Sequence, residues 1–346
     1  MILERATSDD VPAILALANW AAVNTPANFA TEPESLADWA ASFAQSHEQY
    51  PWLVARDGER LLGFAKASMH RARGAYRWTA EVSVYVHPDA HRRGIGRALY
   101  DALIPCLRAQ GYVTLLAGIT PPNPASERLH EAVGFVRCGT YHRAGWKFDR
   151  WHDVGYWDMH LQPVFHSPEP IRPVGNVWPT LHRLRTEREG VSVRRADLES
   201  DEATALIRAL NHELSEMYND PTANHFHLDP AQVTGARGAY VIAYLEAEGG
   251  SEPVGCGAVR AYDDGTAELK RMFVVPRWRG LGISSRILHT LEEHAAGLGV
   301  KRLLLETGTR QTEALALYER AGYARIPLFG DYVHSPLTSI CMGKTI

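Results

Sequence analysis

Short apolar or alternating runs mark the strands of this chain. Residues 52–54, 61–66 and 82–86 are apolar or alternate with polar residues, and their valine and tyrosine side chains suit a pleated sheet. Segments with a helical period separate such runs. In each half of the chain the predicted order is strand, helices, strands, helix, strand, helix, strand.

Two apolar stripes with a spacing of three or four residues predict helices with one buried face. The first stripe follows Gly96 and consists of Leu99, Leu103 and Leu107. Pro105 lies within it, so we expect a kink or an early end there. The second stripe consists of Ile287, Leu291, Ala295 and Leu298. The glycines at 297 and 299 offer stop signals for that helix.

One pattern of residue types occurs twice in the sequence, at an offset of 188 residues. The turn at 91–96 is followed by His130-Glu131-Ala132-Val133-Gly134-Phe135, and the turn at 279–284 by Tyr318-Glu319-Arg320-Ala321-Gly322-Tyr323. In both copies 36 residues separate the turn glycine (Gly94 or Gly282) from the polar residue (His130 or Tyr318). Core packing alone would not fix both the turn and the polar residue. The chain is therefore predicted to contain two copies of one functional site.

A proline-rich segment lies between the copies. Its prolines are Pro163, Pro168, Pro170, Pro173 and Pro179. At this density prolines disfavour a helix or a central strand and favour extended chain. We expect an interdomain connector over 163–189, partly packed through Val174, Val177, Trp178 and Leu181. The predicted domains are 1–162 and 190–346, each of the commonest domain size and able to bury about 70% of its unfolded surface.

Composition narrows the function classes only slightly. Lys and Arg number 36 against 40 Asp and Glu, so no polybasic surface indicates a nucleic-acid or anionic-membrane partner. No run approaches the roughly 18 apolar residues of a membrane span, and a cytoplasmic protein is expected. The four cysteines, Cys106, Cys138, Cys256 and Cys341, lie far apart and are expected to be buried thiols. The spacing over 224–229 resembles a metal motif, but a substrate loop or ordinary surface is favoured over zinc, and no metal is expected.

The glycine turns suggest an anion site. A helix N-terminus exposes unpaired amides with a partial positive charge, and glycines let a pyrophosphate approach them closely. Each turn is therefore expected to cradle an anionic cofactor.

The turns and their surroundings resemble the GNAT family of N-acetyltransferases. In the second copy Val274-Val275-Pro276 precedes Arg279, Gly282 and Ser284, and Gln311 precedes Tyr318 by seven residues. In the first copy Val86-His87-Pro88 precedes His91, Gly94 and Gly96, and Asn123 precedes His130 by seven. The resemblance implies an α/β (α+β) class with two tandem GNAT folds, each a mixed, mostly antiparallel sheet flanked by helices.

The cofactor implied by the resemblance is acetyl-CoA. In the first copy it implies binding by Val84, Val86, His91, Arg92, Arg93, Gly94, Ile95, Gly96, Arg97 and Asn123. In the second it implies binding by Val274, Arg279, Gly280, Leu281, Gly282, Ile283, Ser284 and Gln311. Backbone amides around 84–86 are expected to stabilise the developing oxyanion. His91 stands where the family has Gln or Arg, which matters little if amides bind the phosphates, whereas Ser284 in place of a glycine is expected to crowd them.

The first copy resembles a narrower group, the phosphinothricin and methionine-sulfoximine N-acetyltransferases, over nearly its whole length. The matching segments are 28–33, 50–55, 75–81 and 151–157. The resemblance implies a small amino acid with a second, tetrahedral polar or anionic group, acetylated on its α-amino nitrogen.

Catalysis requires removal of a proton from the ammonium ion before the nitrogen attacks. Glu81, at the start of the strand before the turn, is the candidate base. Tyr318 occupies the position of the family's usual acid, whereas the first copy has His130 there, which is expected to position the amine or relay protons. Glu268 could be the second copy's base if a bulge shifts its strand by one residue. Arg271 could equally hold an anion.

Fixed cations are expected to bind the anionic groups of the substrate. Arg71 and Arg73 are two residues apart, and on an extended segment their guanidinium forks point the same way. The other expected substrate contacts are Phe29, Thr31, Glu32, Tyr76 and Trp78. Gly74 and Arg77 depart from the family's usual asparagine and aspartate, so the preferred side chain could differ.

The second copy matches only the superfamily and leaves three functions open. The first is a small-molecule N-acetyltransferase with one or two working sites. The second is an enzyme fused to a non-catalytic sensor of acetyl-CoA or an amino acid. The third is a protein N-terminal acetyltransferase, which the aromatic and arginine wall of the first copy disfavours. The tandem arrangement also allows an intrachain pseudo-dimer.

Overall fold

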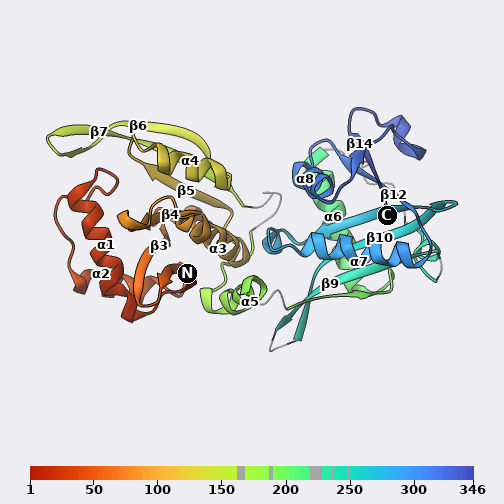
Figure 1. Cartoon of the computed structure of the whole chain (residues 1–346), viewed down its shortest axis with the longest axis horizontal. Coiled ribbons are helices and arrows are strands. Elements are labelled where there is room, and N and C mark those ends of the chain that lie inside the picture. Colours follow the sequence, from red (N-terminus) through yellow and green to blue (C-terminus); the bar gives the residue numbers. More distant parts are fainter. Residues whose placement is uncertain (162–167, 187–189, 219–227, 236, 248–249) are drawn as a thin grey trace. The chain divides into compact units, whose positions relative to one another are not determined.

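The computed structural model describes residues 1–161, 168–186, 190–218, 228–235, 237–247 and 250–346 (Figure 1). The described residues form two compact units, 1–182 and 183–346. The metal-like spacing begins at Asn224, and residues 224–227 lie outside the described residues. Among the helices that are described, none is long and apolar enough to cross a membrane.

The first unit contains one seven-stranded sheet in the order β1-β2-β3-β4-β5-β7-β6. Its strands are β1 (Ile2–Arg5), β2 (Trp52–Asp57), β3 (Arg60–Met69), β4 (Thr79–Val86), β5 (Thr114–Ile119), β6 (Val136–Lys147) and β7 (Arg150–His160). Its helices are α1 (Val11–Asn24), α2 (Leu36–Ser46), α3 (Ile95–Gln110), α4 (Pro124–Val133) and α5 (Val174–Thr186), with 3-10 turns η1 (Ser8–Asp10), η2 (Gly74–Tyr76) and η3 (Pro88–Ala90). Among the described strands of this unit, β4 and β5 pair in parallel and the other neighbours pair antiparallel.

The second unit repeats this topology, with its sheet in the order β13-β14-β12-β11-β10-β9-β8. Its strands are β8 (Val191–Arg195), β9 (Gly238–Ala247), β10 (Gly250–Asp263), β11 (Thr266–Val274), β12 (Arg302–Gly308), β13 (Ala324–Arg325) and β14 (Ser339–Thr345). Its helices are α6 (Asp201–Tyr218), α7 (Ile283–Gly297) and α8 (Thr312–Arg320), with 3-10 turns η4 (Pro230–Gln232), η5 (Pro276–Trp278) and η6 (Gly330–His334). The parallel pair is β11–β12. The predicted fold class, two mixed and mostly antiparallel sheets flanked by helices, is confirmed.

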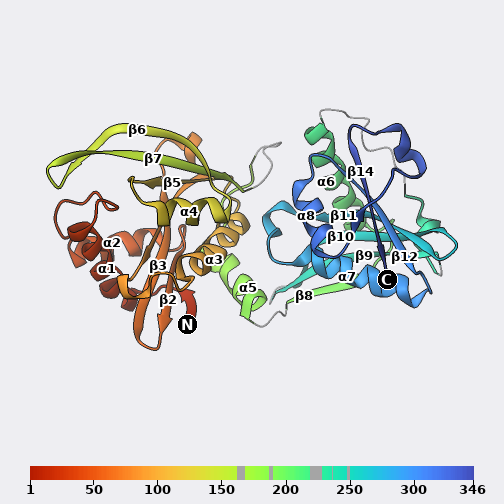
Figure 2. The ribbon, with the colours of Figure 1, turned by 45° about the horizontal axis from the view of Figure 1, so that its top comes forward.

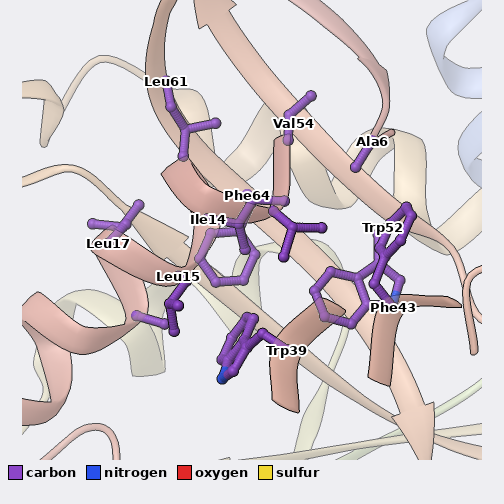
Figure 3. Close-up of a cluster of buried hydrophobic side chains, with 12 residues drawn as sticks. Ala6, Ile14, Leu15, Leu17, Trp39, Phe43, Trp52, Val54, Leu61 and Phe64 are labelled. Carbon is purple, nitrogen blue, oxygen red and sulfur yellow. The ribbon is translucent and has the colours of Figure 1, made fainter. Parts of the chain in front are cut away.

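The core of the first unit lies between its sheet and α1 and α2 (Figure 3). Ile14 of α1 and Phe43 of α2 pack against Trp52 and Phe64, which β2 and β3 direct to this face. Trp39 meets Trp52 edge to face at 5.7 Å. In the second unit α6 covers the corresponding face. Both predicted leucine-type stripes, on α3 and α7, are buried apart from Leu298, which is 40% exposed because α7 ends at Gly297.

Proline does not end or exclude a helix at two places where the sequence favoured this. Of the two alternatives at Pro105, a kink or an early end, the early end is wrong, because α3 continues to Gln110. Helix α5 forms within the expected connector and contains Pro179. A proline inside a helix costs about 3 kcal/mol, but burying each large apolar side chain contributes about 1.5–3 kcal/mol. In both helices the buried residues beside the proline outweigh its cost.

The apolar residues of the connector pack as expected. Val174, Val177, Trp178 and Leu181 are buried, and the Val174 amide donates to the Glu48 carbonyl at 2.7 Å. Of the cysteines, Cys106, Cys256 and Cys341 are buried as predicted. Cys138 is exposed, because β6 lies at the edge of its sheet.

Candidate functional site

In each unit the two parallel strands separate partway along their length. The β4–β5 pairing ends at Glu81 and Leu116, although β4 continues to Val86. The β11–β12 pairing ends at Leu269 and Leu305, although β11 continues to Val274. Beyond these points no described strand pairs with that side of β4 or of β11. The peptide groups around 84–86 therefore lie beside an opening in the sheet.

The two glycine turns have nearly the same backbone conformation. Gly94 and Gly282 precede α3 and α7 with φ of +76° in both cases, a region that favours glycine. A Cβ atom at either residue would meet open space, and no side chain in the described part of the chain caps either helix. The first-turn amides therefore face open space, as an anion site requires.

The side chains at the start of the turns brace them against the strands. His91 Nε2 donates to the Val86 carbonyl at 3.1 Å, and Arg279 Nε donates to the Val274 carbonyl at 2.9 Å. Arg279 also forms two bonds of 2.8 and 2.7 Å to the Glu213 carboxylate. Histidine and arginine thus make the same bond to the strand, which explains how one replaces the other.

Gly96 allows close helix packing. A Cβ atom there would lie 2.9 Å from Leu129 Cδ2 of α4. Asn123 accepts from the Ser126 amide at 3.2 Å and so caps α4. Gln311 accepts from the Gly308 amide at 2.8 Å and from the Thr307 hydroxyl at 2.7 Å. These side chains fix the start of α4 and α8 beside the opening.

Glu81 is half-buried at the end of the β4–β5 pairing. Its Oε1 accepts from His70 Nδ1 at 2.7 Å, and its side chain is 43% exposed. The ring of His70 meets Tyr76 edge to face at 5.3 Å. Sequence reasoning missed His70. In the β3–β4 hairpin Ser68 pairs with Glu81 and Met69 with Ala80, so this register puts residue 70 diagonal to Glu81 on the same face of the sheet.

The expected substrate residues around η2 are only partly brought together. The Arg71 guanidinium lies 5.4 Å from the Tyr76 ring centre, and Arg73 is exposed directly before η2. Burial raises the pKa of Tyr156 on β7, and the charges of Glu81 and Arg71 also act on it. Tyr156 therefore belongs to this cluster. Trp78 instead donates to the Glu169 carbonyl at 2.8 Å, so its indole N–H is directed to the connector.

The loop that carries Phe29, Thr31 and Glu32 is fixed by the β6–β7 hairpin, which extends beyond the sheet towards α1 (Figure 2). Lys147 Nζ donates to the carbonyls of Asn28 at 2.6 Å and Ala30 at 2.7 Å, and also to that of Ala22. Burial lowers the pKa of this ammonium group. Phe29 packs against Gly145 but is still 37% exposed, and Thr31 and Glu32 are also exposed.

His130 of α4 is buried against Tyr100 of α3 and is 3% exposed. Its Nδ1 donates to the Ser126 carbonyl at 2.8 Å, so its Nε2 accepts from the Tyr100 hydroxyl at 2.7 Å. Burial lowers the pKa of the ring, although the Ser126 bond opposes this. Tyr318 is similarly buried on α8, and burial raises its pKa well above the usual range, with Glu306 as the second cause.

Glu268 occupies the same register as Glu81. In the first copy Gly63 pairs with the last residue of β4, and Ser68, five residues later, pairs with Glu81. In the second copy Gly255 pairs with the last residue of β11, and Arg260, five residues later, pairs with Glu268. Glu268 is one residue farther from the end of β11 than Glu81 is from the end of β4. A bulge at Arg271, with φ of +57°, accommodates the extra residue. The Arg271 guanidinium donates to Asn211 Oδ1 at 2.9 Å.

The surroundings of Glu268 differ from those of Glu81. Its side chain is only 1% exposed. Oε2 accepts from Arg260 Nε at 2.8 Å, and Oε1 accepts from Tyr332 at 2.6 Å and lies 3.4 Å from Lys270 Nζ. Both oxygens are therefore engaged by donors of the protein.

The duplicated fold and turns agree with comparisons to known proteins. The family model for the acetyltransferase (GNAT) family matches residues 14–135 and 203–323. The chain belongs to this family. GNAT acetyltransferases use acetyl-CoA, which supplies the acetyl thioester, and the uncapped helix N-termini with left-handed glycines fit its pyrophosphate.

The first GNAT copy is similar to characterised enzymes. It is 38% identical over 172 residues to a phosphinothricin N-acetyltransferase of Streptomyces viridochromogenes, covering 50% of this chain and 93% of that protein. It is 39% identical over 161 residues to an L-methionine sulfoximine/L-methionine sulfone acetyltransferase of Pseudomonas paraeruginosa, covering 46% and 94%. The crystal structure of a phosphinothricin acetyltransferase from Sinorhizobium meliloti in complex with AcCoA is 33% identical, with a TM-score of 0.45 over 46% of this chain and 87% of that one.

Proposed function

We propose that the first copy acetylates the α-amino group of a small amino acid that carries a second tetrahedral polar or anionic group. The observation that carries this proposal is the half-exposed Glu81 carboxylate, held by His70 beside Arg71 at the end of the strand pairing. The substrates named for the two relatives, phosphinothricin and methionine sulfoximine or sulfone, belong to this class.

The residues of the site divide the work among them. The guanidinium groups of Arg71 and Arg73 bind the anionic groups of the amino acid and direct its ammonium group to Glu81. Glu81 accepts the ammonium proton, and the His70 N–H fixes the orientation of its carboxylate. Peptide amides around 84–86 stabilise negative charge on the acetyl oxygen. The amides of 92–97 hold the pyrophosphate.

Two residues act through their neighbours in this proposal. The nitrogens of His130 are bonded to Ser126 and Tyr100, so we assign it to positioning α4. Lys147 holds the carbonyls of the loop that carries Phe29, and so shapes the wall of the amino-acid pocket.

For the second copy we propose an acetyltransferase site for another amine, with Tyr318 as the acid that protonates the leaving thiolate. The shared turn geometry and the kept Gln311–Tyr318 spacing support it. The buried ion pairs of Glu268 favour the alternative, a copy that binds acetyl-CoA without turnover.

The test uses the full chain and two variants, Gly94→Asp and Gly282→Asp, each of which places a carboxylate in one turn. Methionine sulfone, methionine sulfoximine, phosphinothricin and short peptides are incubated with acetyl-CoA, and products are measured by mass spectrometry. We expect acetylated amino acids from the wild type and Gly282→Asp, and none from Gly94→Asp. Products from peptides alone, or undiminished product from Gly94→Asp, would refute the assignment.

A further inference from the structure

Glu306 lies where the sheet of the second unit opens. It follows Leu305, the last residue of β12 that pairs with β11. It is two residues from Leu304, the strand partner of Glu268, so both carboxylates are on one face of the sheet. The position 188 residues earlier in the first copy is Gly118, which has no side chain. The second copy thus has a carboxylate at the opening that the first lacks.

The neighbours of Glu306 come from four other elements. Ser339 of β14 hydrogen-bonds its carboxyl group, and Cys341 of the same strand is its pairing partner. The charges of Lys270 and Glu268 on β11 act on it, and it acts on Tyr318 of α8 and Tyr332 of η6. Glu306 therefore lies between Glu268, which forms the buried ion pairs, and Tyr318, the candidate acid.

Glu306 is more accessible than Glu268, since its side chain is only partly buried. Burial raises the pKa of Glu306, and the Ser339 bond and Lys270 oppose this. A raised pKa makes a carboxylate a stronger proton acceptor near neutral pH.

We propose that Glu306 is the catalytic base of the second copy, in place of Glu268. This inference rests on the proposed acetyltransferase activity of that copy. Glu306 accepts one proton from the substrate ammonium and later releases it to solvent. The freed nitrogen forms a bond to the acetyl carbon as the bond from that carbon to sulfur breaks. Tyr318 gives its proton to the leaving sulfur and regains one from the nitrogen.

The test starts from the full chain carrying Gly94→Asp, which silences the first site. A panel of free amino acids, alkylamines and polyamines is incubated with acetyl-CoA, and the best acetylated amine is used for kinetics. Glu306→Gln is compared with Glu268→Gln and with Glu319→Gln, an exposed neighbour of Tyr318. Thermal melting of each variant identifies loss of folding.

We expect Glu306→Gln to lower kcat about 10²-fold at pH 7 with an unchanged melting temperature. Its rate should recover as pH rises, because the amine then loses its proton to solvent. Glu319→Gln should match the parent, and Glu268→Gln should lower the melting temperature.

Three results would overturn the inference. If Glu306→Gln acetylates the amine at the parental rate, the second copy is an enzyme but another group is its base. A higher KM with unchanged kcat would make Glu306 a binding group for a cationic amine. Absence of any product from a parent that still binds acetyl-CoA would refute both this inference and the catalytic role of the second copy.

Discussion

The two strand glutamates, Glu81 and Glu268, occupy the same register in two copies of one fold and have different surroundings. Glu81 is half-exposed and bonded to a single histidine, whereas Glu268 is buried among Arg260, Lys270 and Tyr332. A carboxylate has about four lone-pair sites, and four protein donors surround Glu268: Arg260 Nε and Nη2 at Oε2, and Lys270 Nζ and the Tyr332 hydroxyl at Oε1. Position in the fold therefore does not determine chemical role, and the partners supplied by neighbouring elements do.

The copies are most alike at the turns, so substitutions there should have the largest and most symmetrical effects. Gly94→Asp places a carboxylate beside the amides of α3, and we expect acetyl-CoA binding by the first copy to be lost. Isothermal calorimetry should then give one site per chain instead of two, and Gly282→Asp should do the same for the second copy. The control is Gly58→Asp. Gly58 also has a left-handed backbone conformation, and a Cβ atom there would also meet open space. Two sites in either turn variant would contradict the anion-site assignment.

The next largest effect should show that Glu81 and Glu268 differ in role, with Glu81 needed for turnover and Glu268 for stability. Glu81→Gln keeps the shape of the side chain but removes its basicity, so kcat for the amino-acid substrate should fall about 10²-fold or more at neutral pH. Part of the rate should return as pH rises. Steady-state kinetics checks this, with Glu131→Gln, an exposed residue of α4, as the control. A wild-type kcat would exclude Glu81 as the base.

Glu268→Gln should instead affect stability. It leaves Arg260 and Lys270 with an uncharged partner inside the protein, and breaking a buried pair costs about 3–5 kcal/mol. Denaturant unfolding should show this loss in the second unit, whereas Glu199→Gln, an exposed residue, should have no effect. If Glu268→Gln unfolds like the wild type, the ion pairs are not structural.

The smallest effect concerns His130, whose counterpart Tyr318 does not titrate near neutral pH. Burial lowers the pKa of His130 below the ordinary 6.5. Between that value and the lower folded pKa, the unfolded chain binds a proton that the folded chain does not. Stability should therefore fall as pH drops below about 6.5, and this contribution should be absent in His130→Gln. Melting temperatures of both proteins from pH 5 to 8 measure it, and parallel curves would show that His130 does not contribute.

Structural features that depend on residues close together in the sequence were predicted well. The glycine turns, the helix stripes and the strands each depend on short-range patterns, and the 188-residue repeat identified the duplication. The predictions of an early end at Pro105 and of a connector without a helix failed because they considered only the local cost of proline. Helix α5 forms around Pro179 because distant residues bury its apolar side.

The sequence alone determined the family, the duplication and the place of each glycine turn, since these depend on backbone conformation and fixed spacing. Tertiary structure decided which carboxylates are accessible. Tyr332, which bonds Glu268, is 64 residues away in sequence, and His70, which bonds Glu81, is 11 residues away across a hairpin. Glu306 reaches the opening only because the parallel strands separate after Leu305. Burial and charge pairing depend on contacts between separate elements, which the period and spacing of residues along the chain do not specify.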